Sequence, residues 1–493
     1  MDPHVRSNVS PGKSVYSWGR TDHGSACDSL ALSAAESRYP LEMSSSWTIV
    51  LAVGLTACSF HPQGTGDDGG PGGDATVADA PPDGLPDDCT PAATACEGRT
   101  LRTCGADHHW DAAQDRACDF TCSAGACVTA SNVPLTQIAT CTSAAPRLAP
   151  PAGATVTVTS ANGLHLACTP DCGDAGVTRI DPQATLTAPT PDLAWFCLSS
   201  ITIPSDVTLT VPSTGGPAEA IAFVVDGAVA IDGTIDFDGL AATSGATGGE
   251  GAPGGSDGAQ RSGSNGVTGS GLCGGSGGAQ MGSGGDTMNW AGGGGGGAGN
   301  ATIAAAGGSG RSGNGNQTAT GGNPGGVCST DTLIPLVGGS GGGGGGDATV
   351  GSSTGWAGGG GGGALQISSR VSITITGTIS ARGGAGYGLA TGTDGGGGGG
   401  AGGALLLESR AIGGMGKLVV DGGSGGPGGA GAGGAGATGS AAPQPGASFA
   451  ASGQGGSGGG GAGGRIRINE AGAACLASTS PSASCTAAEL VAQ

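Results

Sequence analysis

The chain has 493 residues, of which 112 are glycine, whereas only 3% are aromatic and 11% are charged. This composition excludes a mainly helical protein, because each glycine inside a helix costs about 1 kcal/mol relative to alanine. With 17 basic and 37 acidic residues the net charge is −20, so phosphate backbones would repel the chain and nucleic acid is not an expected partner.

The N-terminal part of the chain is predicted to direct export. Residues 1–42 show no helical or strand period and stay unassigned, either as a leader or as a mis-called start. Residues 43–58 contain the longest apolar run, which is too short to cross a bilayer. This run ends in Leu55-Thr56-Ala57-Cys58, which resembles a bacterial lipobox. The resemblance implies a lipoprotein signal, with Cys58 lipidated and the protein anchored at the outer membrane. An ordinary secretory signal and a buried apolar strand are the alternatives.

An acidic linker follows the signal. Residues 59–88 consist mainly of Gly, Pro, Ala and Asp and contain no Lys or Arg. Self-repulsion and the lack of apolar surface predict an extended, disordered tether that lifts the rest of the chain away from a membrane.

Residues 89–130 are predicted to form a small disulfide-rich module. They hold six cysteines but few large apolar side chains, and so small a domain needs covalent staples. Zinc is the weaker interpretation, because the cysteine spacings fit structural zinc sites poorly. The stretch Cys96–Cys104, followed by Trp110 and Cys118, resembles short cysteine-rich modules of exported myxobacterial proteins. Six cysteines allow 15 pairings, and the sequence leaves the connectivity open.

The cysteines beyond the signal number 14 and fall into local groups of even size, which suits an oxidising compartment. A catalytic thiol is not expected, because His165 is the only histidine after residue 109. The cysteines expected in disulfides are Cys89, Cys96, Cys104, Cys118, Cys122, Cys127, Cys141, Cys168, Cys172, Cys197, Cys273, Cys328, Cys475 and Cys485.

A repeated β unit predicts the fold class. Residues 131–217 alternate apolar and polar positions and predict short strands of a β-rich N-terminal part. Within the glycine-rich repeat domain, 218–470, three segments align without gaps: Ala220–Asp226, Ala364–Arg370 and Ala404–Arg410. A similar glycine-bounded segment follows each: Gly233–Gly239, Gly377–Gly383 and Gly416–Gly422.

One such unit buries too little apolar surface to stand alone, so stacked copies are expected to pair in parallel. The predicted fold is all-β, a parallel β-solenoid or β-helix-like stack with long glycine-rich loops, preceded by the disulfide-rich module. Residues 471–493 are assigned as a C-terminal cap or tail.

Stacking also predicts columns of charged residues. Asp226 would align with Arg370 and Arg410, and Asp238 with Arg382 and Asp421. The favoured interpretation is a ladder of cross-strand ion pairs. The alternative is a carbohydrate-active enzyme similar to the β-helical polysaccharide lyases and hydrolases, whose carboxylates would be Asp226, Asp232, Asp236 and Asp238.

Most glycines lie between the repeat copies, where they form either mobile linkers or packed arrays of polyglycine II-like or turn-rich chain. No helix pattern follows the many G-x-G-x-x-G matches, so a dinucleotide site is excluded. No cofactor is expected except calcium, for which Gly342–Val350 is a degenerate binding nonapeptide with Thr349 at its large apolar position. Incidental calcium sites would involve Asp257, Asp286 and Asp394.

The glycine-rich repeat region resembles exported glycine-rich surface proteins, including those of myxobacteria, and superficially the PE-PGRS proteins of mycobacteria, whose helical domain it lacks. The resemblance implies a surface location and assigns no functional residue. We therefore expect a non-catalytic, lipid-anchored scaffold at the cell surface that contacts matrix, other cells, polysaccharide or other surface proteins. A third hypothesis is an ice- or crystal-binding surface made of polyproline II-type helices.

Overall fold

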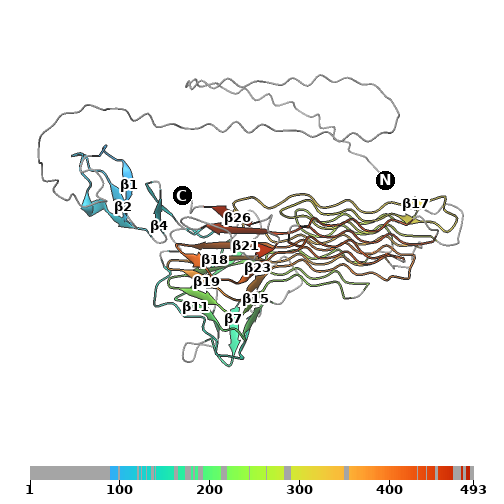
Figure 1. Ribbon diagram of the computed structural model, residues 1–493, viewed down its shortest axis with the longest axis horizontal. Helices are drawn as coiled ribbons and strands as arrows, with labels where there is room; N and C mark the ends of the chain where they lie inside the picture. The colour runs from blue at the N-terminus through green and yellow to red at the C-terminus, as the bar shows by residue number, and fades with distance from the viewer. Residues whose placement is uncertain are drawn as a thin grey trace, which may run out of the picture. The chain divides into compact units, whose positions relative to one another are not determined.

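The structure is a computed structural model that describes residues 89–488 apart from short internal gaps (Figure 1). The gaps are 98–99, 119–120, 124, 129, 135–137, 139, 160–164, 173–178, 181–183, 187–191, 212–218, 244, 262–263, 282–289, 349–354, 430, 440, 450–452, 470–478 and 481–484. The chain divides into two compact units, 1–80 and 81–493, and every described residue belongs to the second.

Several predictions from the sequence fall outside the described residues: those on the leader, the signal with Cys58, the tether 59–88, Asp286 and Cys475. Among the described residues no helix is long and apolar enough to span a bilayer. The helix η1 (Ala112–Gln114) is a single 3-10 turn, and the regular structure around it is almost entirely β, as the composition predicts.

In the cysteine-rich segment the strands are short and antiparallel. They are β1 (Thr94–Glu97), β2 (Thr100–Thr103) and β3 (Arg116–Ala117), with a separate pair β4 (Thr121–Ser123) and β5 (Ala126–Val128). Three disulfides join these elements: Cys89–Cys104, Cys96–Cys122 and Cys118–Cys127. Further along the chain the pairs are Cys141–Cys197, Cys168–Cys172 and Cys273–Cys328, so each pair stays within one of the predicted local groups.

Three larger sheets hold the repeated units. The first contains β9 (Ala184–Leu186), β10 (Leu193–Leu198), β13 (Ala220–Val225), β18 (Ala364–Ser369), β21 (Ala404–Ser409), β24 (Arg465–Asn469) and β26 (Cys485–Ala488). The second contains β11 (Ile201–Ile203), β14 (Val229–Ile231), β19 (Ile373–Ile375) and β22 (Ile412–Gly413). The third contains β6 (Thr155–Thr159), β7 (His165–Thr169), β8 (Arg179–Ile180), β12 (Thr208–Thr210), β15 (Thr234–Asp236), β20 (Thr378–Ser380), β23 (Lys417–Val419) and β25 (Thr479–Ser480).

Each repeated unit sends three successive strands to these three sheets in the same order. The pairing between units is parallel, and Ile221 lies opposite Leu365, which lies opposite Leu405. Residues that align without gaps in the three copies are therefore the residues that lie opposite one another in the first sheet. Antiparallel pairing in these sheets is confined to β9 and to the β6–β7–β8 meander.

The sequence missed a fourth unit. Strands β10, β11 and β12 pair in parallel with β13, β14 and β15, so residues 193–210 form another copy. The unit lacks the glycine-bounded signature and contains Pro204 between β11 and β12, which hides its similarity to the other copies.

The hydrophobic core lies between the three sheets. Its inward-facing aliphatic and aromatic side chains are fully or almost fully buried, and the rings of Phe196 and Phe223 are 5.7 Å apart. A second buried cluster lies on the other face of the first sheet, and it joins Trp195 and Leu406 of the sheet with Ile138 and Leu336 from outside it. Both faces of this sheet are therefore buried, which explains why its strands are apolar at nearly every position.

We predict that Phe223→Ala destabilises the protein by about 3–5 kcal/mol, because the ring is completely buried and the parallel ladder cannot collapse around the space it leaves. Urea denaturation followed by circular dichroism measures the change. Val371→Ala is the matched control, since this side chain is 51% exposed and its removal should shift stability by no more than about 0.5 kcal/mol. Equal effects of the two substitutions would contradict a shared core.

Candidate functional site

The first candidate site is the set of four carboxylates that an enzyme on this fold would use. Asp226, which follows β13, forms a 2.6 Å ion pair with Arg370, as the predicted column requires. The guanidinium of Arg370 also donates to the carbonyls of Cys141 and Ile138 at 2.8 and 2.9 Å. This pair therefore holds the segment around residue 140 against the end of the first sheet.

The other three carboxylates lie near β15. Asp232 accepts from the hydroxyl of Thr376 at 2.5 Å, and Asp238 accepts from the hydroxyl of Ser380 and from the backbone N–H of Arg382. The Arg382 side chain lies 3.6 Å from Asp238 and 3.8 Å from Asp421, so the second predicted column also forms. Asp236 and Asp238 are two residues apart, and the Asp238 N–H donates to Asp236 at 3.0 Å.

The surroundings of Asp236 raise its proton affinity. Burial raises the pKa of Asp236 above its ordinary value of 3.8, and the negative charge of Asp238 raises it further. The backbone N–H of Asp238 and the positive charge of Arg382 act in the opposite direction but are outweighed. Asp236 therefore keeps its proton to a higher pH than an exposed aspartate does.

A buried carboxylate that the sequence did not single out is Glu408 in β21, only 1% exposed. It accepts hydrogen bonds from the N–H and hydroxyl of Ser131, and from Gln366, Ser368 and Asn469, at 2.6–3.0 Å. These five donors occupy its oxygens, so Glu408 fastens the chain near residue 131 to the first sheet. A Glu that directly follows the apolar run Ala404–Leu407 within the same strand was the available signal.

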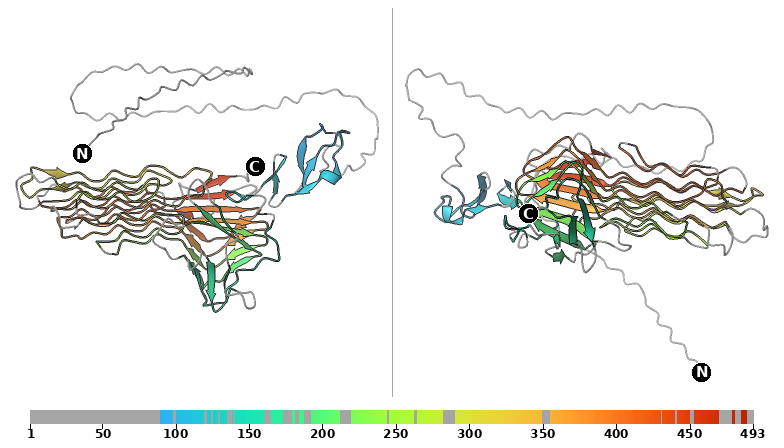
Figure 2. Two further views of the ribbon diagram at one scale, coloured as in Figure 1. Left: turned by 180° about the vertical axis from the view of Figure 1, so that it is seen from behind. Right: turned by 90° about the horizontal axis from the view of Figure 1, so that it is seen from below.

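The second candidate site is the glycine-rich part of the chain, which forms neither linkers nor loops. Extended segments leave the sheets and return, lying side by side along their length (Figures 1 and 2). We call these segments glycine rows. The rows used below are 264–270, 273–281, 291–300, 303–309, 320–326, 338–348, 393–403, 442–449 and 454–464.

The central row, 291–300, has six neighbouring rows. Its N–H groups donate in rotation to three of them, with Gly295, Gly296 and Gly297 bonding to Gly396, Ser276 and Ala305 at 2.8–2.9 Å. The carbonyls of the same three glycines accept from Gly459, Gly343 and Gly325 at 2.9–3.0 Å. A change of partner at each residue and a repeat every three residues are what a polyproline II-type helix produces. The rows are therefore packed as polyglycine II, one of the two arrangements that the sequence left open.

Glycine is required in these rows because the backbones approach too closely for a side chain. All residues of 291–300 are buried, and an added Cβ on Gly296 would overlap the carbonyl oxygen of Asn323. The same overlap with a neighbouring backbone recurs at Gly343 and Gly398. The glycine runs thus form an interior, which corrects the expectation of long glycine-rich loops.

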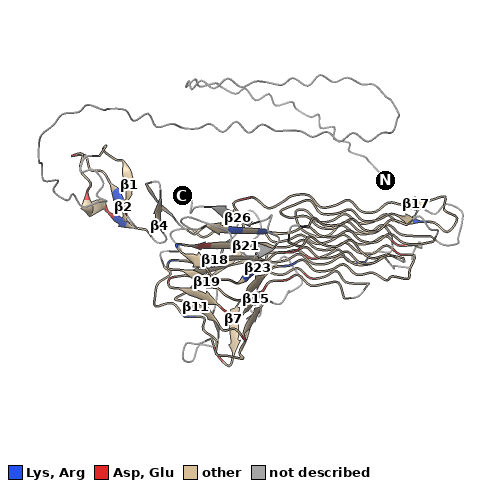
Figure 3. Cartoon of the chain, in the orientation of Figure 1, with Lys and Arg blue, Asp and Glu red and all other residues tan. Residues whose placement is uncertain are grey.

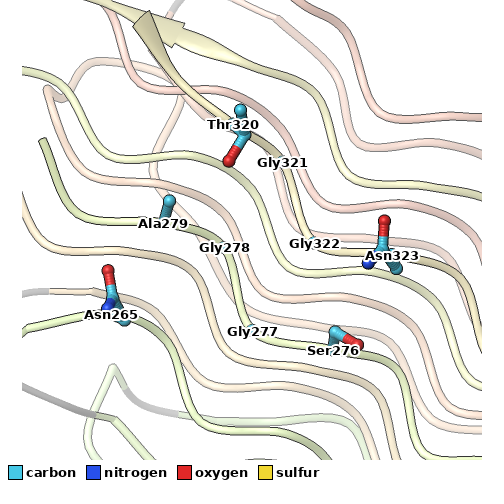
Figure 4. Close-up of a pocket in the computed structure, with 9 residues that line it drawn as sticks. All are labelled: Asn265, Ser276, Gly277, Gly278, Ala279, Thr320, Gly321, Gly322 and Asn323. Carbon is cyan, nitrogen blue, oxygen red and sulfur yellow. The ribbon is translucent and has the colours of Figure 1, made fainter.

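Where the rows reach the surface, one shallow trough has a volume of about 480 Å³ (Figure 4). Its floor is the row 273–281, and the rows 264–270 and 320–326 flank it. The side chains that line it are uncharged and polar or small: Asn265, Ser276, Ala279, Thr320 and Asn323. Figure 3 shows that charged residues are sparse along the rows. The trough can offer hydrogen bonds but no strong charge.

The degenerate calcium motif does not form a binding turn in the part that the structure describes, because Gly342–Gly346 belong to an extended, buried row. Asp257 and Asp394 accept from the backbone N–H groups of Gly251 and Ala348 at 2.8 and 3.1 Å. Within the described residues no group of three or more His, Cys, Asp or Glu side chains could hold a metal ion.

Comparisons with known proteins found no matching family model, no matching curated protein and no matching solved structure.

We predict that Gly296→Ala loosens the glycine rows, because the methyl group must displace a buried backbone carbonyl at a cost of about 1–3 kcal/mol or more. Hydrogen exchange read by mass spectrometry should show faster exchange across 291–300 and its neighbours. Gly413→Ala is the matched control, since no atom lies within 4 Å of its added Cβ. Unchanged exchange in the Gly296 variant would contradict the packed-row arrangement.

We predict that Asp236→Asn raises stability at neutral pH. A carboxyl whose pKa is raised on folding stabilises the protein below its ordinary value of 3.8, and this contribution is lost as the pH rises through the raised pKa. The asparagine variant should therefore match the wild type near pH 3 and unfold at higher urea concentration at pH 7. Asp238→Asn should change stability in the opposite direction at pH 7, because it weakens the contacts with Arg382.

Proposed function

We propose that the protein is an exported, lipid-anchored scaffold at the cell surface, with a structural or adhesive role and no catalytic one. In this proposal the three parallel sheets are the faces of a β-solenoid, and residues 89–130 are a disulfide-rich module between the tether and that solenoid. The packing of the glycine rows is the observation that carries the proposal. Their interior groups are satisfied by neighbouring backbones, which supports a stiff body rather than a reactive cleft.

The lining of the trough supports contact with uncharged, hydrogen-bonding material. Asn265, Thr320 and Asn323 are exposed amide and hydroxyl side chains, which suit the hydroxyl groups of a neutral polysaccharide or matrix polymer. Four aspartates that could serve catalysis instead hold hydroxyl, guanidinium or backbone N–H groups in the β stack. Both features favour a surface that binds along its length over one that cleaves.

The test of the scaffold function uses the full purified chain with a panel of neutral and acidic glycans. We expect co-sedimentation with one or more insoluble neutral polysaccharides and no new reducing or unsaturated ends. Thr320→Lys with Asn323→Lys should lower the bound fraction, whereas Thr202→Lys, a change at an exposed position on β11, should not. Release of new sugar ends by the wild type would contradict a non-catalytic role.

The anchoring part of the proposal rests on the lipobox-like Leu55–Cys58 and has a separate test. Cells that express the protein and are fed a palmitate analogue should yield labelled protein in the membrane fraction. Cys58→Ser should abolish the label. Equal labelling of the two proteins, or none in either, would contradict lipid anchoring and leave the scaffold argument to the glycan experiment.

The alternative function is a carbohydrate-active enzyme, and the raised pKa of Asp236 is the observation in its favour. A carboxyl whose pKa is raised by burial, as that of Asp236 is, has the property that a general acid needs. On that hypothesis the glycan panel releases sugar ends, and Asp236→Asn abolishes the release without unfolding the protein.

A further inference from the structure

The floor of the trough is a glycine row with an incomplete set of neighbours. Its residues 275, 276, 278 and 279 donate to the rows 338–348 and 320–326 at 2.9–3.1 Å. The same four residues accept from the rows 264–270 and 291–300 at 2.8–3.0 Å. Among the described residues, this floor row thus has four bonded neighbours, whereas the central row has six.

A backbone N–H group without a partner in the described part of the chain belongs to the residue before each of the pairs 275–276 and 278–279. Gly274 and Gly277 have no backbone hydrogen-bond partner among the described residues, and Gly277 lines the trough. Because a polyproline II-type helix repeats every three residues, their N–H groups point the same way, about 9 Å apart. These N–H groups form a line of hydrogen-bond donors that face the space where one more row would pack.

One side chain marks where an acceptor belongs. The next N–H of this line is that of Gln280, and it donates to the side-chain oxygen of Asn265 at 2.6 Å. Asn265 also lines the trough, as Figure 4 shows. Its amide carbonyl therefore takes the place that a carbonyl of a neighbouring row has elsewhere. Farther along, at Gly277 and Gly274, the equivalent places are open to a ligand.

The ligand that fits is an extended, uncharged chain with carbonyl oxygens at three-residue intervals. The outer row 442–449 of this same protein has that chemistry. Its inward carbonyls, those of Gln444 and Ala447, accept from Gly460 and Ser457 at 3.0 and 3.1 Å. Pro445 and Ser448, each one residue further on, are exposed, and their carbonyls have no hydrogen-bond partner among the described residues.

Proline strengthens this complementarity. Pro443 and Pro445 have no N–H, so this row presents acceptors with few competing donors, and the proline ring favours the extended conformation that the trough requires. Neither 442–449 nor the trough lining contains a charged side chain. Approach of two copies at this contact therefore brings no like charges together, despite the net charge of −20.

We propose that the trough at Gly277, continued along the floor row to Gly274, is the docking site for row 442–449 of a second copy of this protein. The two surfaces of the contact are different, so a pair of copies retains one free trough, on one copy, and one free outer row, on the other. Such a head-to-tail contact adds further copies unless the geometry closes into a ring. The inference goes beyond the proposed function, because it requires neither the lipid anchor nor a glycan.

The experiment measures the mass of the full purified chain by sedimentation velocity over a wide concentration range. We expect the wild type to associate as concentration rises. Thr320→Lys blocks the trough, and Ala442→Lys blocks the outer row, because both residues are exposed and neither side chain is part of the packed interior. Each variant alone should therefore stay monomeric.

Mixing the two variants provides the decisive readout. The Thr320 variant keeps a free outer row and the Ala442 variant keeps a free trough, so an equimolar mixture should form a species of two chains and nothing larger. Thr374→Lys, an exposed change on β19, is the control and should associate like the wild type. Circular dichroism of every variant checks that the β structure is retained.

Three results would overturn the inference. One is a wild type that stays monomeric at every concentration, and another is association that Thr320→Lys does not weaken. The third is a mixture of the two variants that remains monomeric, which would show that the two surfaces are not halves of one contact. All three leave the scaffold function to its own glycan test.

Discussion

The close approach of glycine backbones is the interaction on which the rest of the structure depends. Carbonyl oxygens of one row lie where the Cβ atoms of the next row would be, as at Gly296 and Gly398. Each interior residue thereby exchanges hydrogen bonds with two different neighbours, and apolar side chains contribute little. The stability of this region comes from many modest backbone hydrogen bonds that are all satisfied together. A single side chain in the interior affects several rows at once.

The sheets and the glycine rows specify one another. Row 393–403 runs directly into β21, and row 454–464 runs into β24, so the parallel register of the first sheet also aligns the rows that precede its strands. The bond from Gly363 N–H to the Phe237 carbonyl, 2.8 Å long, lies at such a junction. The packing of aliphatic side chains between the sheets thus sets the order in which the rows lie together. The rows therefore need no side chains of their own to select their neighbours.

Polar side chains serve mainly to fasten segments that the repeats do not place. Glu408 and Arg370 both hold the chain between residues 131 and 141 onto the first sheet, one through buried hydrogen bonds and the other through an ion pair and two carbonyl contacts. Removal of either partner would leave a buried polar group unsatisfied. A side chain has the same role at the trough, where Asn265 accepts from the Gln280 N–H, which no backbone carbonyl of a described glycine row reaches.

Sequence alone determined the β class, the alignment of three units and the ion-pair columns of Asp226 and Asp238, because strand alternation and a gapless repeat are local signals. Local cysteine grouping also predicted the range of the pairs that the structure shows, such as Cys168–Cys172. Only the tertiary structure decided the fourth unit at 193–210, the burial of Glu408 and the partners of each glycine row. A run of glycines carries no pattern that distinguishes one neighbour from another, so partner choice depends on where the distant strands bring each row.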